Sequence, residues 1–123
     1  LVTERHEIIM THAIIYKSSL NGEILGFKTE GHANFAKKGS DIVCASISVL
    51  VVNTINAIDL YTVDKYETQV NEDLALIEFK LNPFVSEIHV SNEARVLLNA
   101  LELGLSQIAA GNPKHLSIMI EEV

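Results

Sequence analysis

Cysteine is nearly absent from this chain of 123 residues, which holds one, Cys44. A single cysteine cannot form a disulfide within the chain, and small secreted domains usually carry an even number. We therefore expect a cytoplasmic protein. A lone thiol is also available for chemistry, so Cys44 is a candidate nucleophile.

Basic residues are scarce as well. Nine Lys and Arg stand against 16 Asp and Glu, which gives a net charge of −7. Without a basic surplus to neutralise phosphates, direct binding of nucleic acid is disfavoured. The same imbalance favours encounter with a basic partner through long-range electrostatic attraction.

The chain also lacks the marks of membrane, exported and metal-binding proteins. Its most apolar run, 42–58, is interrupted by Ser, Thr and Asn, and we expect it to be too short and too polar to span a bilayer. No segment combines a charged start, an apolar middle and a small-residue cleavage site, so we expect no signal peptide. The histidines show no metal-ligand spacing, so we expect neither a metal site nor another cofactor.

The length fits one domain. Residues 1–9 precede Met10, where a new pattern begins, and we expect them to be an N-terminal extension, either vector-derived or from an upstream start. The single domain is then expected over residues 10–123.

Five strands and two helices are predicted within this domain from apolar periodicity and capping residues. The strands are expected over 12–16, 24–28, 63–70, 74–81 and 115–120, and the helices over about 41–60 and between a cap at Ser91 or Asn92 and a stop at 111–113. An Asn21-Gly22 pair predicts a hairpin turn between the first two strands. The order β-β-α-β-β-α-β indicates an α+β fold with a mainly antiparallel sheet packed with two helices. The first helix is apolar on both faces over much of its length, so we expect it to be mostly buried.

The stretch 31–48, GHANFAKKGSDIVCASIS, holds the residues best suited to chemistry. Ser40 or Asp41 is expected to cap the first helix, which places Cys44 in its first turn. The free N–H groups and the dipole there favour the thiolate, which is the nucleophilic form of cysteine. His32 precedes Cys44 by twelve residues on a glycine-bearing loop, and it would take the thiol proton and later deliver it to the leaving amine.

Each of these residues also has a plain structural interpretation. Cys44 fits a small buried core residue, and His32 fits a surface loop histidine. Asp41 either orients the imidazole as the third member of a triad or caps the helix, and the two roles can coexist. Ser48, one turn after Cys44, is placed to bond a bound peptide or a loop, or else its own helix carbonyl.

Together these residues resemble the motif of the ribosomal-processing cysteine protease family, Prp. The resemblance is carried by Gly31-His32-Ala33, Gly39, Asp41-Ile42-Val43-Cys44-Ala45 and Ser48, and it covers about residues 10–122. The pairing of GHA with DIVCA at this spacing is specific, whereas either half alone is weak. Ala36 is a departure, because many members carry glycine there, so we expect the loop to hinge at Gly39.

The resemblance implies a cytoplasmic, homodimeric cysteine endopeptidase that removes the N-terminal extension of large-subunit ribosomal protein twenty-seven after an apolar, phenylalanine-containing segment. It implies that Cys44 is the nucleophile, His32 the base and Asp41 a third member of the site. It also implies that the loop 34–40 orders over the substrate, with Gly31, Gly39 and Ser48 in the loop or near the peptide. An acidic enzyme would attract such a basic substrate. The alternative function is a non-catalytic ribosome-assembly adaptor that binds the same extension without cutting it.

Overall fold

The fold is an α+β arrangement of five strands and two helices, as the sequence predicts. The computed structural model describes residues 10–31, 38–82 and 90–123, so the expected extension 1–9 lies outside it. The elements follow in the order β1 (Thr11–Lys17), β2 (Ile24–Glu30), α1 (Lys38–Tyr61), β3 (Tyr66–Asn71), β4 (Leu76–Leu81), α2 (Asn92–Gly111) and β5 (Leu116–Glu122). The predicted order β-β-α-β-β-α-β is confirmed.

The strands form one mixed sheet in the order β3-β4-β2-β1-β5. The β1–β2, β2–β4 and β3–β4 pairs are antiparallel, and β5 joins β1 in parallel. The first hairpin forms as expected, but its connection is wider than a two-residue Asn-Gly turn. The Ser18 N–H donates to the Glu23 carbonyl at 2.8 Å, and the Asn21 side chain accepts from the Glu23 N–H at 2.9 Å. Asn21 therefore stabilises a longer loop through its side chain.

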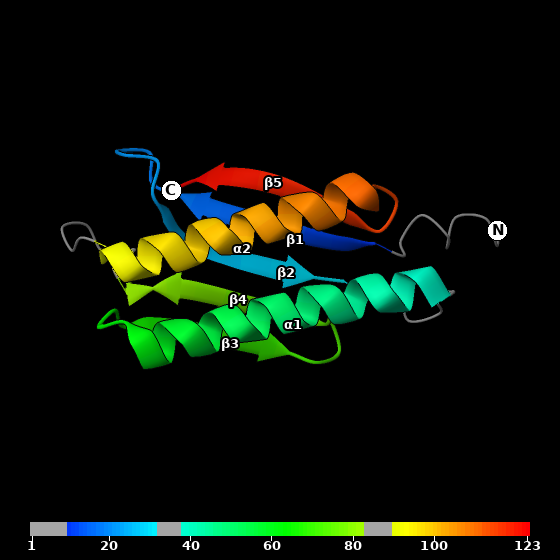
Figure 1. Ribbon diagram of the computed structural model, residues 1–123, viewed down its shortest axis with the longest axis horizontal. Coiled ribbons are helices and arrows are strands. Elements are labelled where there is room, and N and C mark those ends of the chain that lie inside the picture. Colours follow the sequence, from blue (N-terminus) through cyan, green and yellow to red (C-terminus); the bar gives the residue numbers. More distant parts are fainter. Residues whose placement is uncertain (1–9, 32–37, 83–89) are drawn as a thin grey trace.

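Both helices cover the same face of the sheet and run in opposite directions (Figure 1). The alternation of strand residues sends one set of apolar side chains from each strand toward the helices. The largest fully buried side chains are those of Phe27, Phe79, Ile15, Ile58, Leu81, Leu98, Leu101, Leu105, Leu116 and Val51. Each contributes about 1.5–3 kcal/mol to folding when buried completely. The core thus lies between one sheet face and the inner faces of both helices.

Helix α1 differs from the expectation in two ways. It begins at Lys38, so Ser40 and Asp41 lie inside its first turn and do not precede it as caps. A helix that has formed adds one hydrogen bond for each further residue, and this one extends across Gly39, which the sequence had marked as loop. The expectation of a mostly buried helix was also wrong, because Val49 and Leu60 on its outer face are 70% and 71% exposed.

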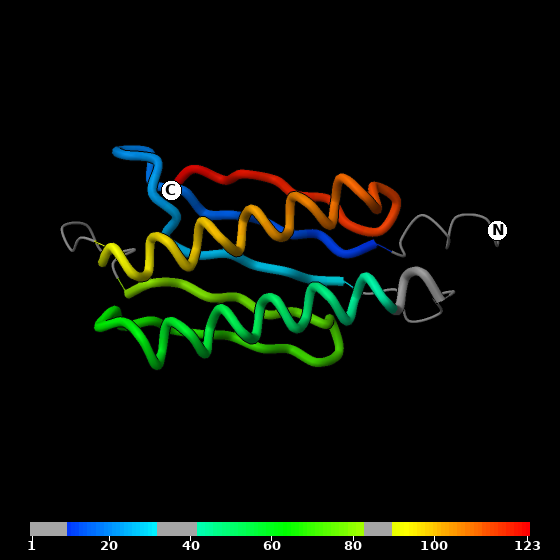
Figure 2. Tube along the Cα trace, viewed as in Figure 1, coloured from blue at the N-terminus to red at the C-terminus, as the bar shows by residue number. Residues whose placement is uncertain are grey.

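The segment Ile42–Tyr61, of 20 residues, is long and apolar enough to cross a membrane, with a mean hydropathy of 1.8 in its most apolar window. The expectation that this run is too short and too polar to span a bilayer was therefore wrong, as far as length and composition decide it. The core helices of soluble proteins can meet the same criteria of length and hydropathy. In the trace of Figure 2, α1 lies along the sheet beside α2, and its buried residues pack into the shared core.

Candidate active site

Cys44 lies in the second turn of α1, on the side of the helix that faces the sheet. Since α1 begins at Lys38, Cys44 is its seventh residue and not the third or fourth that a cap at Asp41 or Ser40 would require. The N–H groups left free at a helix start belong to its first four residues, and the dipole effect falls off within the first turn. The helix start therefore favours the thiolate of Cys44 less than the sequence suggested.

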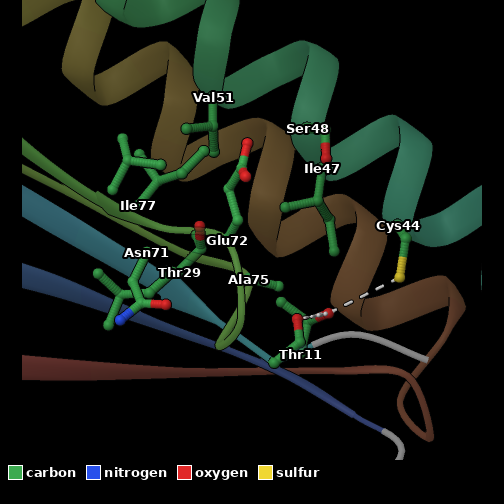
Figure 3. Close-up of a pocket in the computed structure, with 13 residues that line it drawn as sticks. Thr11, Thr29, Cys44, Ile47, Ser48, Val51, Asn71, Glu72, Ala75 and Ile77 are labelled. Atoms are coloured by element: carbon green, nitrogen blue, oxygen red, sulfur yellow. Dashed lines mark hydrogen bonds between the residues drawn. The ribbon is translucent and has the colours of Figure 1, made fainter. Parts of the chain in front are cut away.

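The sulfur of Cys44 points from α1 toward Thr11 at the start of β1 (Figure 3). The distance between the Cys44 Sγ and the Thr11 Oγ1 is 4.0 Å. Thr11 is 5% exposed, and its hydroxyl also donates to the carbonyl oxygen of Gly31 at 3.1 Å. Cys44 itself is half-buried, so its thiol is accessible from the neighbouring cavity.

Gly31 directly follows β2 and contacts two other segments, the residue before β1 and the turn between β3 and β4. Its φ of 85° lies in the left-handed region, and a Cβ there would stand 2.7 Å from the Met10 carbonyl oxygen. Its N–H donates to the Leu74 carbonyl at 3.1 Å in the turn between β3 and β4. Glycine is therefore required here by conformation and by space. His32 is the next residue in the sequence after this anchored glycine.

A cavity of about 340 Å³ opens beside the Cys44 sulfur, a size within the range of ligand sites. Its walls come from α1, from the first residues of β1, from the end of β2 and from the β3–β4 hairpin. The described lining residues are Thr11, Thr29, Gly31, Cys44, Ile47, Ser48, Val51, Val70, Asn71, Glu72, Ala75, Leu76 and Ile77. Most of this surface is apolar, which suits an apolar side chain of an extended peptide.

The structure brings three of the predicted site residues together and places a fourth elsewhere. Cys44, Ser48 and Gly31 line the same cavity. Gly39 lies in the first turn of α1, so its expected position as a loop hinge was wrong. His32 lies outside the described residues, as does the side chain of Asp41, and their roles stay predictions.

Several residues of the cavity carry no signal in the sequence. Thr11 and Thr29 belong to strands, where threonine is common, and Glu72 is one of two acidic residues in the turn between β3 and β4. Their approach to Cys44 depends on the order of the strands in the sheet, which the sequence pattern does not give. Within the described segments, no group of three His, Cys, Asp or Glu side chains gathers to hold a metal ion.

Comparison with known proteins places this geometry in one family. The family model described as "Cysteine protease Prp" matches residues 10–117. The ribosomal processing cysteine protease Prp of Bacillus subtilis is 30% identical over 99 residues, which cover 80% of this chain and 87% of that protein. The protein of the same name from Mycoplasma genitalium is 33% identical over 89 residues, which cover 72% of this chain and 81% of the relative.

Solved structures show the same fold. Two crystal structures of an essential ribosomal processing protease Prp from S. aureus superpose with TM-scores of 0.78 and 0.76, at 19% and 20% identity. Each match covers 91% of this chain and 100% of the S. aureus chain. That protein is bound to a substrate peptide in one structure and to a covalently linked product peptide in the other.

Proposed function

The chain belongs to the cysteine protease Prp family, and from this premise we propose that it removes the N-terminal extension of large-subunit ribosomal protein twenty-seven. As a member of this family it is a cysteine protease. The observation that carries the proposal is the position of the one thiol, half-buried in the wall of a mainly apolar cavity of about 340 Å³. An extended peptide with an apolar side chain in that cavity would pass its backbone close to the sulfur.

In the proposed reaction the thiolate of Cys44 attacks the carbonyl carbon of the scissile bond. His32 takes the thiol proton and returns it to the amine of the leaving fragment, and water then hydrolyses the thioester. The free N–H groups in the first turn of α1 are candidates to stabilise the oxyanion, which forms on the substrate carbonyl and not on the sulfur itself. Asp41, in the same turn, is proposed to orient His32.

The surface and charge of the molecule support the remaining parts of the proposal. The net charge of −7 would draw a basic ribosomal protein toward the site and make association weaker at high salt. We propose a homodimer formed through the outer faces of α1 and α2, where Ile42, Val49 and Leu103 are 66%, 70% and 60% exposed. The small residues Ala45, Ser46 and Gly104 line a groove there and would allow a second copy to approach closely. A cytoplasmic location is proposed because the substrate is a ribosomal protein.

The test is cleavage of a peptide that spans the extension and the first mature residues of the ribosomal protein. Wild-type protein should cut one bond, located by mass spectrometry, whereas Cys44→Ala and His32→Ala should not cut it at a measurable rate. A peptide of the same composition in scrambled order is the control. Binding of the intended peptide by wild type without any cleavage would overturn the proposal and support the adaptor function.

A further inference from the structure

We propose that Thr11 stabilises the thiolate of Cys44 by turning its hydroxyl hydrogen from the Gly31 carbonyl to the sulfur. This inference rests on the proposed role of Cys44 as nucleophile and adds a donor that the family motif does not contain. It follows from the contacts of one buried hydroxyl group that lies between a reacting atom and the residue before His32.

The hydroxyl of Thr11 has two neighbours and one hydrogen. Its Oγ1 is 3.1 Å from the Gly31 carbonyl oxygen, to which it donates, and 4.0 Å from the Cys44 Sγ. A hydroxyl can donate once and accept through its lone pairs. While its hydrogen points to Gly31, a hydrogen bond between oxygen and sulfur requires the thiol as donor. This arrangement of the hydroxyl therefore suits the protonated thiol, whose S–H can donate to Thr11.

Ionisation of the thiol reverses the roles of donor and acceptor between Thr11 and Cys44. When the thiol proton passes to a base, the sulfur becomes a charged acceptor, and the unchanged hydroxyl would present a lone pair to it. Rotation of the Thr11 hydroxyl removes this repulsion and forms a hydrogen bond to a charged atom, which is stronger than the neutral bond to Gly31. Thr11 keeps its own hydrogen throughout, so the proton lost by the thiol resides on the base.

The surroundings of the Cys44 sulfur disfavour a negative charge, so a hydrogen-bond donor is needed to stabilise the thiolate. Ile47 and Val51 on α1, with Val70, Leu76 and Ile77 on the β3–β4 hairpin, give the cavity an apolar lining that disfavours a charge. The charged side chain among the described lining residues is that of Glu72 in the β3–β4 turn, which repels a thiolate. Cys44 is also in the second turn of α1, beyond the strongest effect of the helix dipole.

The rotation also links the thiol to the segment that carries His32. Gly31 is held at two points, by its N–H to Leu74 and by its carbonyl to Thr11. Formation of the thiolate would release the second of these contacts. The backbone immediately before His32 thus changes its bonding as the nucleophile forms.

The experiment is the rate of alkylation of Cys44 by iodoacetamide as a function of pH, which reports the pKa of the thiol without any substrate. Thr11→Val should move the midpoint of this pH profile upward by about one unit and slow alkylation roughly tenfold on the acidic side of the midpoint, whereas Thr11→Ser should stay close to wild type. Thr29→Val is the matched control: Thr29 is also 5% exposed and lines the same cavity, but it makes no hydrogen bond to the sulfur among the described residues. It should leave the thiol pKa unchanged, and thermal unfolding checks that each variant is folded.

A second series in the His32→Ala background separates direct from indirect action. If Thr11 donates to the sulfur itself, Thr11→Val raises the pKa by the same amount with and without His32. An effect that disappears in this background would mean that Thr11 acts through the position of His32, and it would overturn the inference. Equal profiles for wild type and Thr11→Val would overturn it as well. If wild type fails to cut the peptide, the proposed function is refuted. The alkylation experiment still measures the effect of Thr11 on the thiol, because it uses no substrate.

Discussion

Tyr16 is held in its protonated form by its neighbours in the sheet. Its side chain alternates with those of the core residues on β1, and its hydroxyl donates to the Glu78 carboxylate at 2.5 Å. The Lys80 ammonium lies 5.9 Å from the centre of its ring. Burial, the hydrogen bond to Glu78 and the negative charge of that carboxylate raise the pKa of Tyr16 well above its ordinary value of 10.0. Folding therefore favours the neutral phenol.

This raised pKa predicts a loss of stability at alkaline pH. The unfolded chain releases the Tyr16 proton near pH 10.0 while the folded chain retains it, so the stabilisation is complete below that pH and falls as the pH rises above it. The difference in free energy of unfolding between wild type and Tyr16→Phe should shrink between about pH 10 and about pH 11. Tyr61→Phe, at a side chain 73% exposed, is the matched control. A wild-type minus Tyr16→Phe difference that stays constant across this range would contradict the prediction.

At the level of single residues, the sequence identified Cys44, Ser48 and Gly31, which share one cavity. They were recognisable because they belong to one short segment with a helix start and a loop. Thr11 is 33 positions from Cys44 and follows no motif, and its contact with the sulfur arises from the packing of β1 against α1. No local pattern carries this kind of information.

At the scale of the element, the start of α2 depends on a series of hydrogen bonds that link Asp64, Ser91 and Ala94. Ser91 is its N-cap, and the Ser91 hydroxyl oxygen accepts from the Ala94 N–H at 3.1 Å. Asp64, between α1 and β3, accepts from the Ser91 N–H at 3.0 Å and from the Ser91 hydroxyl. The hydroxyl thus serves as donor and acceptor at once and joins the connection after α1 to the first turn of α2.

Ser91→Ala should accordingly lower the free energy of unfolding by about 1–2 kcal/mol, because it removes the cap and leaves Asp64 with one contact fewer. Ser46→Ala is the matched control, since the exposed Ser46 hydroxyl donates to the Ile42 carbonyl of its own helix at 2.8 Å. That substitution should change stability by less than about 0.5 kcal/mol. Equal effects of the two substitutions in denaturant unfolding would contradict the importance of the cap.

The two helix starts show what capping rules can and cannot predict. Ser91 was one of two predicted caps, and the structure assigns the role to it, because a serine before a periodic apolar segment is a strong local signal. The start of α1 was placed three or four residues late. Ser40 and Asp41 are typical cap residues and Gly39 is a poor helix former, yet the helix extends back to Lys38. The earlier start of α1 also affects the chemistry, because it moves Cys44 out of the first turn.

At the scale of the whole molecule, the sheet has helices on one face, and the outer faces of those helices remain apolar. Val49 and Leu103 are 70% and 60% exposed, on α1 and α2. The sequence predicted burial for this surface of α1 because it is apolar, and a single copy of the chain does not cover it. A partner copy would reconcile the apolar composition with the exposure.

Wild-type protein is expected to sediment as a dimer at micromolar concentration, and Val49→Asp as a monomer, because a charge at the centre of an apolar interface is left without a partner. Leu20→Asp, at a residue 90% exposed in the loop between β1 and β2, is the matched control and should remain dimeric. A monomeric wild type would contradict the dimer proposal. So would a Val49→Asp variant with the wild-type sedimentation coefficient.

Cys44 is the one cysteine of the chain, so its part in the chemistry can be measured directly. Wild-type protein is treated with iodoacetamide until the intact mass shows one added group, and cleavage of the ribosomal extension peptide is measured at each extent of modification. We predict that activity falls in direct proportion to modification and reaches zero when it is complete. Protein that is fully modified at Cys44 and still cuts the peptide would contradict the account.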